Sequence, residues 1–141
     1  MAILDTGEDM KRRGVFTISI LLLLSFAILT GCSAMTVKLG WVGNSVPGHS
    51  EASFSRFRGE ERYSMQLQGG ETLVLRYEAE LEEGSLVLRF LNSGDAVVWE
   101  EGMDSDAVAD VRIKVEEAGW YDLVVYGDDA RGRFDLYWSM D

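Results

Sequence analysis

The 141-residue sequence contains only one cysteine, one histidine and one proline. One cysteine cannot form an intramolecular disulfide, so a fold of this chain depends on its own apolar core. One histidine cannot complete the ligand set of a zinc enzyme, and we expect no metal and no other cofactor. His49 lies beside Ser50 in a stretch with glycine and proline, where adjacent residues fix no catalytic geometry. The sequence therefore predicts a protein without enzymatic activity.

Basic residues are also scarce. Acidic residues number 24 against 13 basic ones, and the formal net charge is −11 at pH 7. Residues 1–31 contain three acidic and three basic residues, so this net charge belongs entirely to residues 32–141. A domain with this sign is repelled by phosphate backbones and anionic headgroups, and we expect no binding to nucleic acid.

The N-terminal part has the order of an export signal. The cationic run Lys11–Arg13 is followed by an apolar stretch from Val15 to Leu29, which is typical of a signal peptide and too short for a membrane span of about 20 residues. The acidic residues before Met10 add nothing to such a signal, so Met10 is the favoured natural start.

The apolar stretch ends in Leu29-Thr30-Gly31-Cys32, which resembles the lipobox of bacterial lipoprotein precursors. The resemblance implies that residues 1–31 are removed as a signal peptide and that Cys32 receives acyl chains such as palmitate. Each buried methylene contributes about 0.8 kcal/mol, so two or three chains anchor a protein stably. We expect an extracytoplasmic protein of the cell envelope, held by Cys32 on a cell membrane or an outer membrane.

Residues 32–52 show little periodicity and contain three glycines and the proline. They are predicted to form the lipid anchor and a tether. Trp41 and Val42 are the exception, because they either pack as a first strand or belong to the linker.

From residue 53 to residue 141, apolar and polar residues alternate with a period of two, the pattern of strands with one buried face. Sequences rich in turn-forming residues separate the alternating runs: Gly69-Gly70, Glu83-Gly84, Asn92–Asp95, Glu101-Gly102, Ala118-Gly119 and Asp128–Gly132. Together they predict an all-β domain over residues 53–141, following the N-terminal signal helix. The expected architecture is a jelly-roll-like antiparallel β-sandwich of seven or eight strands.

Three segments of this domain resemble the bacterial pre-peptidase C-terminal domains, which are secreted jelly-roll sandwiches. They are Gly70–Leu75, in which Gly-Glu opens a strand, Gly119–Gly127, a Gly-aromatic-Tyr strand, and Gly132–Trp138, a closing Gly-x-Phe-x-Leu strand. The resemblance implies an accessory module without catalytic activity.

Four tryptophans are many for a domain of this size, and Trp138 falls within the core alternation. Trp41, Trp99 and Trp120 are the candidate rings for stacking a ligand, with core packing as the alternative.

Several apolar residues fall on the side opposite to the core alternation: Val74, Val87, Trp120, Val124 and Tyr126. Either Trp41 and its neighbours or a crossing loop cover them, or they form an exposed patch that binds a ligand or a partner.

Carboxylates gather around one predicted turn, with Asp104, Asp106 and Asp110 close to Glu100 and Glu101. Calcium takes several oxygen ligands from one loop, but this spacing lacks the glycine and terminal glutamate of a helix-loop-helix calcium site. The sequence leaves open whether the three aspartates bind calcium.

The sequence thus indicates a lipid-anchored, non-catalytic binding or accessory module of the bacterial cell envelope. One alternative is a carbohydrate-binding module for cell-wall polysaccharide, which predicts exposed rings on a flat or grooved face. The other is a structural subunit of an envelope protein complex, which predicts a larger apolar patch.

Overall fold

The structure is a computed structural model that describes residues 35–141; the predicted signal helix and Cys32 lie outside the described residues. Every element is a strand, and all pairings are antiparallel. The strands are β1 (Val37–Leu39), β2 (Val42–Val46), β3 (His49–Leu67), β4 (Thr72–Leu91), β5 (Val97–Met103), β6 (Ala107–Lys114) and β7 (Gly119–Met140). Within the described part of the chain, no helix is long and apolar enough to cross a membrane. The predicted all-β antiparallel fold of seven strands is confirmed.

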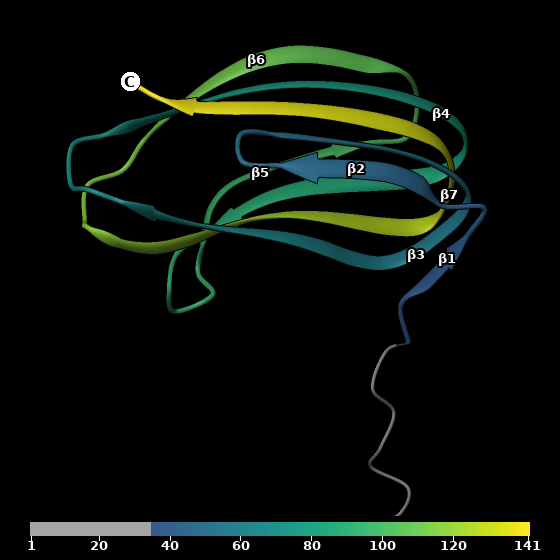
Figure 1. The fold of residues 1–141 in the computed structure, drawn as a ribbon, viewed down its shortest axis with the longest axis horizontal. Coiled ribbons are helices and arrows are strands. Elements are labelled where there is room, and N and C mark those ends of the chain that lie inside the picture. The colour runs from purple at the N-terminus through teal and green to yellow at the C-terminus, as the bar shows by residue number, and fades with distance from the viewer. Residues whose placement is uncertain (1–34) are drawn as a thin grey trace, which may run out of the picture. The chain divides into compact units, whose positions relative to one another are not determined.

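Three strands are unusually long: β3 has 19 residues, β4 has 20 and β7 has 22. β7 lies between β3 and β4 and pairs with both along most of its length. All three turn back on themselves at the same end of the domain (Figure 1). A hydrogen bond within β3 shows the bend of this strand: Ser50 Oγ donates to Tyr63 Oη at 2.6 Å, although the two residues are 13 positions apart. A straight strand would separate these residues by roughly 40 Å.

Irregular register marks the bends. Pairing shifts between Phe54 and Gly59 in β3 and between Leu81 and Ser85 in β4. At the matching position in β7, Gly132 has φ +148°, and a Cβ there would lie 1.9 Å from the carbonyl oxygen of Glu80. Only glycine permits this approach of two backbones.

The turns predicted from the sequence are therefore only partly confirmed. Gly69-Gly70, Asn92–Asp95 and Ala118-Gly119 connect successive strands, whereas Glu83-Gly84 and Asp128–Gly132 lie at bends inside β4 and β7. Glu101-Gly102 lies inside β5. Glycine and aspartate signal a change of direction, but the hydrogen bonds of a long strand continue through it.

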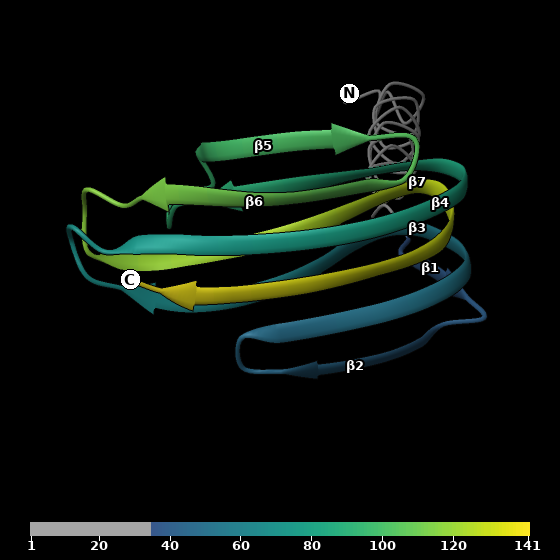
Figure 2. The same cartoon turned by 90° about the horizontal axis from the view of Figure 1, so that it is seen from above.

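The bends divide the strands into two packed layers, which we call sheet I and sheet II. Sheet I runs in the order β2, the first half of β3, the second half of β7, the first half of β4, and β6. Sheet II contains the second half of β3, the first half of β7, the second half of β4, and β5, while β1 pairs with β3 at the bend. β2 lies at one edge of the sandwich, and β5 and β6 lie at the opposite edge (Figure 2).

The core fills the space between the two sheets, and Phe57, Phe90 and Leu123 are completely buried in it. Trp41 joins this core, since its ring centroid lies 5.2 Å from that of Phe57 and 5.6 Å from that of Phe54. The core thus extends beyond the alternating residues to the chain segment before them.

The tether predicted for residues 32–52 is wrong from Val37 onward. β1 and β2 pair with β3, which itself begins at His49, so the sandwich starts well before residue 53. All five residues of β2 are exposed, and an edge strand exposed on both sides leaves no alternation to detect.

Candidate ligand-binding face

The three candidate tryptophans do not form one platform. Trp41 packs in the core, and Trp99 is half-buried with its ring centroid 6.2 Å from that of Tyr77. Only Trp120 is strongly exposed, at 57%, and it lies on the outer side of sheet II opposite Gln66.

The outer side of sheet II is covered by its own side chains. Arg62 Nη1 donates a hydrogen bond to Asp122 Oδ2 at 2.7 Å, and this bond raises the pKa of the guanidinium. Arg89 donates a hydrogen bond to Glu100, which likewise raises the pKa of Arg89.

The same two arginines lie next to two of the apolar residues on this side, Val124 and Tyr126. Val124 lies directly opposite Arg62 on one strand and Arg89 on the other, and it is fully buried. The guanidinium carbon of Arg89 lies 4.6 Å from the ring centroid of Tyr126. Long arginine stems cover apolar surface while their charged ends stay in water. Trp41 takes no part in this cover, because it faces the interior of the sandwich.

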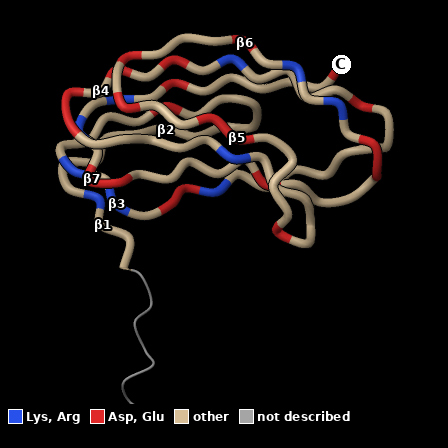
Figure 3. Tube along the Cα trace, turned by 180° about the vertical axis from the view of Figure 1, so that it is seen from behind, with Lys and Arg blue, Asp and Glu red and all other residues tan. Residues whose placement is uncertain are grey.

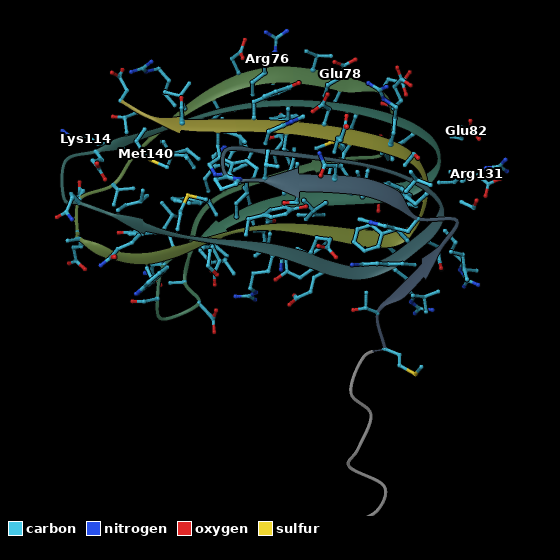
Figure 4. All side chains as sticks on the ribbon, viewed as in Figure 1. Arg76, Glu78, Glu82, Lys114, Arg131 and Met140 are labelled. Atoms are coloured by element: carbon cyan, nitrogen blue, oxygen red, sulfur yellow. The ribbon has the colours of Figure 1, made fainter. Side chains whose placement is uncertain are left out.

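The outer side of sheet I is more open. His49 and Tyr137 lie directly opposite each other, and their rings stack with centroids 4.1 Å apart and planes 5° apart. Tyr137 keeps 48% of its surface exposed. Arg76 lies opposite Tyr137 on the next strand and projects outward from the sheet (Figure 4).

Carboxylates occupy the neighbouring row. Glu51 lies opposite Asp135, which in turn lies opposite Glu78. His49 Nε2 and Asp135 Oδ1 form a hydrogen bond of 2.7 Å that links this row to the aromatic pair. Acidic and basic residues are interspersed along the strands as a whole (Figure 3).

A hollow of about 320 Å³ lies beside these two rows; among the residues that line it are Val42, Asn44, Glu51, Ser53, Arg133 and Asp135. A second hollow of about 560 Å³ adjoins it at Ser53 and Arg133 and extends toward the bend, where Glu82 and Arg131 line it. Figure 4 shows these last two residues at that end of the domain. The outer side of sheet I thus offers an exposed ring, a histidine, carboxylates and arginines along a shallow depression. We call this surface, from Asn44 and His49 to Arg76, the sheet I face.

The aspartates considered for calcium lie at separate positions in the turn before β6 and on β6 itself. Asp106 Oδ1 accepts a hydrogen bond of 2.9 Å from the backbone N–H of Leu81, and Asp110 lies on β6 opposite Arg76. Asp104 lies in the turn between β5 and β6. Within residues 35–141, these aspartates do not form a group of three converging ligands.

Sequence reasoning missed the sheet I face. His49 stood in the predicted tether, and Tyr137 and Asp135 occupy polar positions of the final alternating run. An exposed tyrosine at a polar position of a strand was the one available signal.

No protein-family model matches this chain, and no curated protein matches it in sequence. A solved structure described as "CBM4 structure and function" is similar with a TM-score of 0.51 and 8% identity, over 79% of this chain and 81% of that one. This likeness shows the β-sandwich fold.

Two further solved structures have lower scores. The C-terminal CBM6 of a marine laminarinase from Zobellia galactanivorans gives a TM-score of 0.46 at 17% identity, over 74% of this chain and 88% of that one. A carbohydrate binding module of lichenase 5A from Cellvibrio mixtus, solved with cellotriose, gives 0.44 at 13% identity, over 74% and 86%.

Proposed function

We propose that this protein is a non-catalytic carbohydrate-binding module of the bacterial cell envelope, anchored by lipid on Cys32. The observation that carries the proposal is the stacked pair of His49 and Tyr137 on the outer side of sheet I. Nearly half of Tyr137 is exposed, beside a row of carboxylates and a shallow hollow.

The chemistry of this face suits a sugar. An aromatic ring packs against the C–H face of a pyranose, while carboxylate, amide and guanidinium groups exchange hydrogen bonds with its hydroxyls. Asn44, Glu51 and Arg133 supply one group of each kind along the hollow. An open depression of this sort accommodates a segment of an extended polymer better than it encloses a small metabolite.

The fold is consistent with this function. The solved structure described as CBM4 shares the sandwich over most of both chains. The resemblance to pre-peptidase C-terminal domains leads to the same kind of role, an accessory module beside a different activity.

The anchor rests on the sequence. Leu29-Thr30-Gly31-Cys32 resembles a lipobox, and a lipid on Cys32 would keep the domain at an envelope surface.

Retention on polysaccharide tests the function. The chain from Ser33 onward is incubated with purified cell-wall polysaccharide of the source organism, and the bound fraction is measured over a range of polysaccharide concentrations. We expect saturable retention that Tyr137→Ala weakens at least about tenfold, because the only exposed ring of the sheet I face is lost.

Trp120→Ala is the matched control, since Trp120 is an exposed ring on the other sheet, with 57% of its surface exposed against 48% for Tyr137. It should leave retention unchanged. Retention that depends on Trp120 and not on Tyr137 would move the site to sheet II, and no retention at all would overturn the carbohydrate function.

A protein partner is the second candidate, because β2 is an exposed edge strand with apolar residues. Val42 is 72% exposed and Val46 is 47% exposed, and the strand from Val42 to Val46 contains no charged residue. Unprotected edges pair with strands of other chains. Capture of one stoichiometric envelope protein in the same experiment, without polysaccharide retention, would favour this role.

A further inference from the structure

Three side chains on the sheet I face converge as metal ligands. His49, Glu51 and Asp135 each offer one ligand atom, and these atoms lie within 4.8 Å of one another. Two neighbouring strands supply them, with Glu51 directly opposite Asp135 and His49 two residues earlier on β3. The side chains of His49 and Asp135 are 26% and 19% exposed, whereas Glu51 is exposed, so the group lies at the surface with two of its three ligands partly shielded from water.

The charges around this group are poorly compensated. Like charges directly opposite each other on neighbouring strands are destabilising, and Glu51, Asp135 and Glu78 form three such positions in a row. Arg133 lies 3.8 Å from Glu78 and 3.6 Å from Glu80. Among the residues that the structure describes, Glu51 has no ion pair within 4.0 Å, and Asp135 has only His49. A bound cation would remove the repulsion between the two carboxylates.

We propose that His49, Glu51 and Asp135 bind a divalent transition-metal ion of the zinc type. One imidazole nitrogen and two carboxylate oxygens are ligands that zinc accepts, whereas calcium and magnesium prefer oxygen ligands alone. Tetrahedral zinc with bonds of about 2.0–2.1 Å holds its ligand atoms roughly 3.3 Å apart. The 2.7 Å separation of His49 Nε2 and Asp135 Oδ1 needs only a small opening to admit the ion.

The surroundings support the site. Tyr137 stacks on the imidazole and limits its rotation, so the nitrogen is held toward the carboxylates before the ion arrives. Glu51 and Asp135 also line the hollow of about 320 Å³, so open space for a fourth coordination position adjoins the group. Water or a hydroxyl of a bound ligand would fill that position.

The proposed site departs from the expectation of no metal. That expectation counted histidine and cysteine, but two carboxylates complete a three-ligand set when strand pairing brings them to one histidine. The metal site rests on the positions of three side chains and does not depend on the carbohydrate function. A zinc titration without sugar therefore tests it separately.

Calorimetric titration with zinc chloride tests the proposal. The full chain is purified in detergent without a polyhistidine tag, with Cys32→Ser so that no thiol competes for zinc, and bound metal is removed by chelator and dialysis. We expect saturable binding of one ion per chain, and a rise in the melting temperature when zinc is added. His49→Ala and the isosteric Glu51→Gln should each weaken binding at least about tenfold.

Glu78→Gln is the matched control, because Glu78 lies in the same row of carboxylates but outside the group of three. It should weaken zinc binding far less than Glu51→Gln, because it removes a neighbouring charge but no ligand atom. Glu51→Gln also keeps the test valid if His49→Ala fails to fold, which circular dichroism reports. No saturable heat, or binding that neither His49→Ala nor Glu51→Gln weakens, would overturn the proposal.

Discussion

The two outer sides of the sandwich use similar residues in different ways. On sheet II, Arg62 bonds to Asp122 at 2.7 Å, and Arg89 bonds to Glu100 while it covers Tyr126. On sheet I, Arg133 comes no closer than 3.6 Å to a carboxylate, and Glu51 faces Asp135. Val124 is fully buried in the first surface, whereas Tyr137 is nearly half exposed in the second.

This difference indicates which surface has polar groups available to bind a ligand. Hydrogen bonds and ion pairs already formed within a face must be broken before a ligand uses them. Sheet II has paired most of its charges, so its arginines act mainly in stability, and Trp120 remains as its exposed ring. Sheet I retains carboxylates and a ring whose contacts are incomplete, which is the condition of a binding surface.

The largest effect should follow from a change at the bend that creates both faces from one set of strands. Gly132→Ala places a Cβ 1.9 Å from the carbonyl oxygen of Glu80, and we expect it to lower the free energy of unfolding by about 3 kcal/mol or more. Urea unfolding followed by tryptophan fluorescence measures the loss.

Gly119→Ala is the matched control, because Gly119 has a similar φ of +157° but no atom within 4 Å of the added Cβ. It should cost only the backbone strain, about 1 kcal/mol. Equal losses for the two variants would mean that the close approach at the bend does not limit this fold.

A smaller effect should distinguish the arginines of the two faces. Arg62→Ala removes the partner of Asp122 and the cover of Val124, and we expect a loss of roughly 1 kcal/mol. Arg133→Ala breaks only long contacts to exposed carboxylates and should change stability by less than about 0.5 kcal/mol. Thermal unfolding of both variants measures the contrast, and a larger loss for Arg133→Ala would reverse our assignment of the faces.

The smallest effect concerns the interior that joins the two sheets. Burial raises the pKa of Tyr63 above its ordinary value of 10.0, although the hydrogen bond from Ser50 acts in the opposite direction. The folded state therefore favours the protonated phenol. The contribution of this pKa shift to the free energy of unfolding is complete below pH 10 and is lost as the pH rises above that value.

Tyr63→Phe removes the titrating group and should be less stable than the parent protein at pH 8, because Ser50 loses its partner. The difference in the free energy of unfolding between the variant and the parent protein should narrow at pH 11. Urea unfolding at both pH values measures it, and a gap that widens with pH would contradict the direction of the pKa shift. Tyr77, whose pKa burial also raises, leaves some pH dependence in the variant.

The sequence predicted the sandwich more accurately than its strands. Alternation placed Leu73, Leu88 and Phe134 in the core, and all three are buried. The sequence predicts a turn at Asn92, and the side-chain oxygen of Asn92 accepts hydrogen bonds from the N–H groups of Gly94 and Ala96. The continuity of β4 and β7 through their bends was missed, because a bend and a turn use the same residues and differ only in which strand pairs next.

The sequence by itself determined the acidic charge, the two-residue alternation and hence the class of fold, because each of these depends on composition or on neighbours along the chain. It also carries the lipobox-like segment on which the proposed anchor rests. The tertiary structure alone decided which polar residues meet. His49 and Asp135 are 86 positions apart, and only the register between β3 and β7 brings them within 2.7 Å. That register comes from the packing of the whole core, and no local pattern in either strand encodes it.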